Sequence, residues 1–126
     1  MGRDSLSISV LLADDNEIVR KAIVGVLKGD PEIQIVAEVP SLDETIRLTS
    51  KLQPKIIIMD IHMGDENIFP PSKVRSSFVV SRLLAISLWT DDQTKALAKS
   101  FGAFELLDKT KLAFELIPAI KRCVQD

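Results

Sequence analysis

The chain has 126 residues, 46% hydrophobic and 27% charged, which is the size and balance of one globular domain with a buried core. Its net charge of -2 and pI near 5.4 exclude a general electrostatic attraction to nucleic acid or anionic lipid. The apolar runs are much shorter than the roughly 20 residues of a spanning helix, and a lone cysteine, Cys123, excludes an internal disulfide and suits the reducing cytoplasm. We therefore expect a single cytoplasmic domain over 1–126, with its core at about 8–124 and no contact with membrane or nucleic acid.

The first part of the chain predicts two strand–helix pairs. Residues 8–13 form an apolar, β-branched run typical of a buried strand, and apolar residues then recur at helical spacing over 18–27. A Gly-Asp-Pro sequence ends this helix, and 33–39 reads as a second strand. Ser41, followed by glutamate three residues later, forms a capping box for a helix to about Leu52.

The middle of the chain is less regular. Residues 55–59 predict a third strand, which ends at Asp60. Between 61 and 78, the Pro70-Pro71 pair permits only a short helix that starts there.

The last part of the chain predicts two more pairs. Residues 83–87 form a fourth strand, and a capping box at Thr90 starts a helix to about Ser100. Gly102 ends that helix, 103–107 is a fifth strand, and Thr110 is the expected N-cap of the last helix. The apolar face expected for this helix consists of Ala113, Leu116, Ile117, Ile120 and Val124.

Five such pairs with apolar strands predict an α/β fold, a doubly wound parallel sheet with helices on both faces. Ligands of such sheets bind outside the carboxyl ends of the strands. The residues expected there are Asp14 and Asp15 after the first strand, Asp60 after the third, Ser87 after the fourth and Lys109 after the fifth.

These five side chains suit metal-assisted phosphoryl transfer. Three carboxylates packed together repel one another unless a cation joins them, and Mg²⁺ prefers oxygen ligands and pairs carboxylates with phosphate. Asp60 can act as the nucleophile that forms an aspartyl phosphate, while Lys109 and Ser87 contact the phosphate oxygens. Each residue alone also has an ordinary reading, as a solvated turn, a helix cap or an exposed charge; the combination is more specific than its parts.

Four segments resemble the receiver domains of two-component response regulators. They are 11–16 (LLADDN, followed by Val19-Arg20), 58–63 (IMDIHM), 84–87 (LAIS) and 102–109 (GAFELLDK). The resemblance covers about 8–124, and the first and last segments are most similar to the subfamily with a LuxR-type helix-turn-helix output domain.

The resemblance implies a flavodoxin-like (βα)5 fold with strand order 2-1-3-4-5 and a switch function rather than an enzymatic one. Asp60 would accept a phosphoryl group from a histidine kinase or phosphotransfer protein, and Ser87 and Lys109 would complete the site. For Mg²⁺, Asp15 would be the principal carboxylate, with Asp14, Asp60 and the His62 backbone carbonyl as further ligands. The resemblance also allows a homodimer and a DNA-binding output domain outside this chain.

The sequence departs from the family pattern at several positions, and Pro70-Pro71 interrupts the helix expected after Gly64. Gly64 stands where proline is usual, Leu88 where a small residue is usual, Leu106 at the aromatic switch position, and Thr110 where other members have proline. We expect these changes to affect the rate at which Asp60 is phosphorylated and the way in which the domain transmits its signal.

Two other functions use similar residues. A phosphohydrolase of the haloacid-dehalogenase type also has an aspartate nucleophile, but it needs a second acid two residues later, where this chain has His62. The second is a pseudo-receiver that binds partners without phosphorylation, which Leu88 and the altered loop after Met63 favour weakly.

Overall fold

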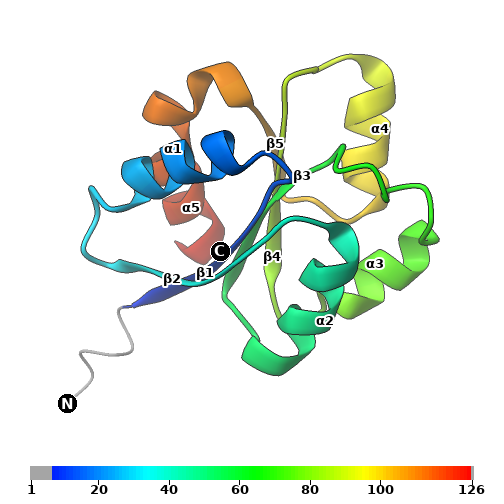
Figure 1. The fold of residues 1–126 in the computed structure, drawn as a ribbon, viewed down its shortest axis with the longest axis horizontal. Coiled ribbons are helices and arrows are strands. Elements are labelled where there is room, and N and C mark those ends of the chain that lie inside the picture. The colour runs from blue at the N-terminus through cyan, green and yellow to red at the C-terminus, as the bar shows by residue number, and fades with distance from the viewer. Residues whose placement is uncertain (1–6, 126) are drawn as a thin grey trace.

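The computed structural model describes residues 7–125 and contains one five-stranded sheet (Figure 1). The strands are β1 (Ile8–Ala13), β2 (Ile33–Val39), β3 (Ile56–Asp60), β4 (Arg82–Ser87) and β5 (Glu105–Asp108). The helices are α1 (Glu17–Leu27), α2 (Leu42–Leu52), α3 (Pro71–Ser77), α4 (Asp92–Ser100) and α5 (Leu112–Gln125). All strand pairs are parallel and their order is β2-β1-β3-β4-β5, which confirms the flavodoxin-like fold.

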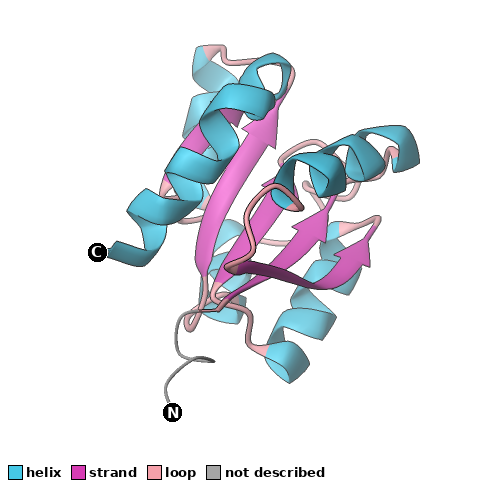
Figure 2. Cartoon of the chain, turned by 90° about the vertical axis from the view of Figure 1, so that its left-hand side faces the viewer, coloured by secondary structure: helices cyan, strands magenta, loops and turns pink. Residues whose placement is uncertain are grey.

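Helices cover both faces of the sheet, as Figure 2 shows. Alternate strand residues point to opposite faces, so the sheet has two apolar cores. One core lies under α1 and α5 and includes Leu12, Ile58, Ile86 and Leu116; the other lies under α2, α3 and α4 and includes Leu11, Ile57, Ala85 and Phe101. Every residue of the central strand β3 is buried, and this packing fixes the position of Asp60 at the end of that strand.

The predicted strands and the first three helices agree with the structure to within about two residues. The N-cap at Ser41 is confirmed, because its hydroxyl accepts the Glu44 N–H. The second half of the capping box is not formed among the described residues, since the Glu44 carboxylate pairs with Arg47. The short helix after Pro70 is confirmed as α3. The apolar face expected on α1 is wrong at two positions, because Ile18 is 80% exposed and Ala22 is also exposed.

The boundaries around α4 and β5 differ from the prediction. Asp91, not Thr90, precedes α4, and its carboxylate accepts the Thr94 hydroxyl proton at 2.6 Å. Gly102 ends α4 with φ of 83°, and the Gly102 and Ala103 N–H groups donate to Lys99 and Ala98. This Schellman arrangement uses Ala103 as part of the helix end, so β5 begins two residues later than expected.

The start and the buried face of α5 also differ. Asp108, not Thr110, is the cap: its carboxylate accepts both the N–H and the hydroxyl proton of Thr110. A 3-10 turn over Lys109–Lys111 follows, and α5 begins only at Leu112. The buried face is therefore rotated from the predicted one, with Ala113 and Val124 exposed. It consists of Leu112, Leu116, Ala119, Ile120 and Cys123.

The loop between β3 and α3 is fixed by a contact with α2. The Asp65 carboxylate accepts the backbone N–H groups of Leu42 and Asp43, each at 3.0 Å, and thus caps a helix more than twenty residues earlier in the chain. Gly64 adopts φ of 104°, a conformation that favours glycine, and its N–H donates to Glu66. These bonds hold the loop that follows the candidate acceptor.

Candidate functional site

The carboxyl ends of β1 and β3 bring three acids together. One carboxylate oxygen from each of Asp14, Asp15 and Asp60 lies within 4.8 Å of those of the other two. Asp14 and Asp15 follow β1 directly, and Asp60 is the last residue of the neighbouring strand β3. The parallel register therefore assembles the acid cluster that the sequence predicted.

Lys109 extends from the end of β5 into this cluster. Its Nζ lies 2.6 Å from Asp14 Oδ2 and 3.0 Å from Asp60 Oδ2, and its side chain is only 9% exposed. Burial alone would lower the pKa of Lys109, but its hydrogen bonds with Asp14 and Asp60 raise that pKa above 10.5. Lys109 is therefore a permanent positive charge between two buried carboxylates.

Asp60 combines burial with two hydrogen bonds. Its Oδ1 accepts the His62 N–H at 3.0 Å and its Oδ2 accepts from Lys109. Burial raises the pKa of Asp60 above 3.8, and the negative charge of Asp14 adds to this effect; the two hydrogen bonds oppose it. The site thus concentrates negative charge that a further cation would relieve.

Asp14 and Asp15 differ in their surroundings. Asp14 is fully buried, and its carboxylate is occupied by the Asn16 N–H at 2.9 Å and by Lys109. Asp15 is exposed and makes no hydrogen bond or ion pair with any residue in the described part of the chain. An oxygen-only donor set with one free carboxylate fits a hard cation such as Mg²⁺.

A recess of about 190 Å³ opens beside the acids. Its walls combine carboxylates, one ammonium group and two exposed apolar side chains, Leu88 and Trp89. The lining residues are Asp15, Asn16, Val19, Asp60, His62, Leu88, Trp89 and Lys109.

Ser87 ends β4 as expected but does not line this recess. Its hydroxyl is fully buried and accepts the Trp89 N–H at 3.0 Å. The role of Ser87, and that of the His62 carbonyl, therefore remain predictions.

Two further residues of the site were not singled out from the sequence. Thr94 on α4 lies 3.2 Å from the His62 ring, which also packs edge-on against Trp89 with ring centres 5.5 Å apart. Arg20, which in the sequence belongs only to the segment that resembles the family, donates to the backbone carbonyl of Asp14. The sequence pattern predicted the helices on which Thr94 and Arg20 lie, but nothing in the sequence indicated these contacts.

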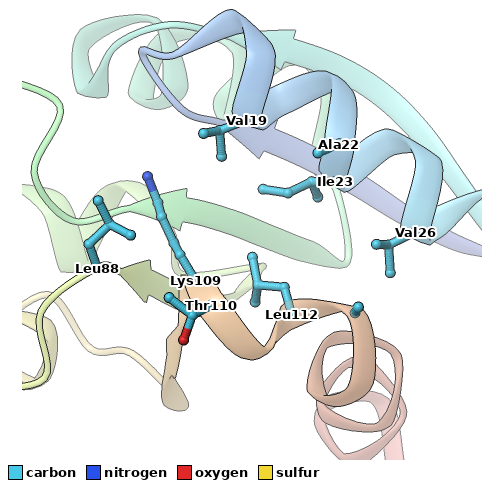
Figure 3. Close-up of a pocket in the computed structure, with 9 residues that line it drawn as sticks. Val19, Ala22, Ile23, Val26, Leu88, Lys109, Thr110 and Leu112 are labelled. Carbon is cyan, nitrogen blue, oxygen red and sulfur yellow. The ribbon is translucent and has the colours of Figure 1, made fainter.

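An apolar groove of about 330 Å³ continues from the recess between α1 and the start of α5 (Figure 3). Figure 3 shows Leu88 and Lys109 at one end of the groove and Val26 at the other. The first end is next to the acids, because Lys109 contacts Asp14 and Asp60. Besides Leu88, Lys109 and Val26, the lining residues are Val19, Ala22, Ile23, Thr110, Leu112 and Ala113.

The sequence matches the family described as response regulator receiver domain over residues 10–121. The chain belongs to this family. It is 30% identical over 115 residues to the transcriptional regulatory protein LiaR of Bacillus subtilis (strain 168), covering 90% of the receiver domain and 54% of LiaR. It is also 32% identical over 104 residues to a protein-glutamate methylesterase/protein-glutamine glutaminase of Methanococcus maripaludis, covering 81% of this chain and 28% of that protein.

A solved structure shows the same fold. A two-component response regulator of the LuxR family from Aurantimonas sp. SI85-9A1 superposes with a TM-score of 0.80 at 24% identity, covering 92% of the receiver domain and 84% of that chain. The receiver domain spans about half the length of LiaR, 54%, and 28% of the length of the methylesterase. Within the described residues, no helix is long and apolar enough to cross a membrane.

Proposed function

We propose that this receiver domain is a phosphoacceptor switch in which Asp60 takes a phosphoryl group. One observation carries the proposal: a buried carboxylate at the end of the central strand lies within 4.8 Å of two further acids and 3.0 Å from the largely buried ammonium of Lys109. A carboxylate oxygen of Asp60 attacks phosphorus, the bond from phosphorus to the donor breaks, and an acyl phosphate forms.

The surrounding residues support this transfer. Lys109 already contacts Asp60 and balances the charge of the incoming phosphoryl oxygens. Asp15, with Asp14, Asp60 and the His62 carbonyl, would hold Mg²⁺, which neutralises negative charge on the phosphoryl group. The Ser87 hydroxyl, now an acceptor for the Trp89 N–H, would donate its own proton to a phosphoryl oxygen and so report the modification.

The donor in this proposal is a histidine kinase or phosphotransfer protein. The apolar groove between α1 and α5 shares Val19, Leu88 and Lys109 with the recess. A protein surface seated in this groove would bring its phosphoryl group beside Asp60, which supports docking of the donor there.

The output in this proposal is a change of partner rather than turnover of a substrate. LiaR is named a transcriptional regulatory protein, which supports a role in the control of transcription. The proposal includes a DNA-binding output segment outside this chain and a cytoplasmic location. Phosphorylation would then control contact with such a segment, or with a second copy.

Intact-mass measurement after treatment with acetyl phosphate and Mg²⁺ tests the proposal. We expect one phosphoryl group on the wild type and on the control Asp92→Asn, which changes an exposed aspartate of α4, and none on Asp60→Asn. A full adduct on Asp60→Asn would refute the assignment of the acceptor. A wild type that gains neither an adduct nor thermal stability from beryllofluoride with Mg²⁺ would favour the pseudo-receiver instead.

A further inference from the structure

Arg20 connects the acidic turn to two neighbouring elements. It is the fourth residue of α1, and its side chain is 17% exposed. Its Nη1 donates to the backbone carbonyl of Asp14 at 2.5 Å, and its Nε lies 3.7 Å from a carboxylate oxygen of Glu38 on β2. The guanidinium group therefore lies between α1, β2 and the turn that follows β1.

The carbonyl that Arg20 contacts belongs to the peptide that joins Asp14 to Asp15. Asp14 is held from its other side, where its N–H donates to Val39 and its carboxylate accepts from Asn16 and contacts Lys109. Asp15 has no side-chain partner in the described structure. Its direction is consequently set by the backbone, and Arg20 is the side chain that restrains the preceding peptide group.

We propose that Arg20 is a positioning residue that orients the Asp14–Asp15 peptide so that the Asp15 carboxylate faces the metal site. This inference rests on the proposed function. Groups that orient metal ligands without touching the metal typically change affinity about 10- to 100-fold when they are removed. A planar guanidinium has several donors in a fixed fork, so it can hold the carbonyl while facing Glu38; a lysine ammonium on its flexible stem lacks this geometry.

A purely electrostatic role makes opposite predictions. The positive charge of Arg20 repels Mg²⁺, so if charge alone mattered, Arg20→Gln would tighten Mg²⁺ binding and Arg20→Lys would leave it unchanged. If Arg20 orients the peptide, both variants weaken binding, because neither keeps the fork.

Calorimetric titration with Mg²⁺ at neutral pH distinguishes these roles. We expect the Kd for Mg²⁺ to rise about 10- to 100-fold in Arg20→Lys and Arg20→Gln. It should stay unchanged in Lys21→Gln, a matched control one residue further along α1 whose side chain is 73% exposed. Wild-type affinity in Arg20→Lys, or tighter binding in Arg20→Gln, would overturn the inference.

Urea unfolding without metal separates positioning from a structural role. A loss of stability in Arg20→Lys with an unchanged Kd for Mg²⁺ would mean that Arg20 only supports the fold, and would refute the proposal. If Arg20→Gln does not fold, Arg20→Lys decides the question alone. A wild type that does not bind Mg²⁺ would overturn the metal site itself, whereas normal binding by both wild type and Arg20→Lys would overturn only the role of Arg20.

Discussion

Lys109→Met tests the central electrostatic feature of the site. Methionine keeps most of the alkyl stem but removes the side-chain cation that contacts both Asp14 and Asp60. Removal of one partner from a buried ion pair costs about 3–5 kcal/mol, because the remaining charge stays buried without compensation. Each carboxylate keeps one backbone N–H donor, so we expect the lower half of that range, about 3–4 kcal/mol at neutral pH without metal.

The loss should depend on pH in a defined direction. The folded pKa of Lys109 lies above 10.5, so its stabilising contribution is complete below pH 10.5 and is lost as the pH rises through the folded pKa. Burial already raises the pKa of Asp60 above 3.8, and without Lys109 it rises further. Asp60 of the variant then takes up a proton and loses its uncompensated charge. The difference in stability between Lys109→Met and wild type should therefore shrink as the pH falls from about 7 toward 5.

Urea unfolding followed by circular dichroism measures these differences in the free energy of unfolding. Saturating Mg²⁺ should recover part of the deficit, because the ion replaces the lost positive charge. The control Lys95→Met, at an exposed position of α4, should stay within about 0.5 kcal/mol of wild type. A deficit below about 1 kcal/mol for Lys109→Met, or one that does not change with pH, would refute the reasoning.

Two other variants test the acids and the entrance to the recess. Asp15→Asn should weaken Mg²⁺ binding in calorimetry and leave the metal-free stability unchanged or higher, because Asp15 has no side-chain partner among residues 7–125 and repels Asp60. Marked destabilisation would instead give Asp15 a structural role. Leu88 is 58% exposed at the recess, so Leu88→Ala should open the approach to Asp60. We expect faster phosphorylation by acetyl phosphate and faster hydrolysis of the phosphoryl group, with Mg²⁺ affinity unchanged and stability within about 0.5 kcal/mol; unaltered rates would exclude a gating role.

The sequence was sufficient for the sheet and for the acid cluster because both follow from short-range patterns. Buried strands appear as apolar runs, and parallel pairing places their carboxyl ends together. The strand ends alone therefore predict that Asp14, Asp60 and Lys109 lie together. Their separations, and the burial that raises the pKa of Asp60, required the structure.

The predicted N-caps were wrong where two nearby residues were both able to cap the helix. Thr90 and Thr110 were reasonable caps by residue type, but a nearby aspartate, Asp91 or Asp108, takes the capping position in each case. The 3-10 turn after Asp108 then rotates the buried face of α5 away from the predicted stripe. Asp65 accepts the N–H groups of Asp43 and Leu42, which lie 22 and 23 residues earlier in the chain, so no local sequence pattern predicts this contact.

The hydrogen bond between Trp89 and Ser87 makes the fluorescence of Trp89 a probe of the state of Ser87. Trp89 is the single tryptophan of the sequence, and its backbone N–H donates to the hydroxyl of Ser87 while its ring packs against His62. If Ser87 turns toward a phosphoryl group on Asp60, that hydrogen bond breaks and the surroundings of Trp89, a residue that is 59% exposed, change. Its emission can therefore follow the switch in real time without an attached dye, and no second indole contributes background.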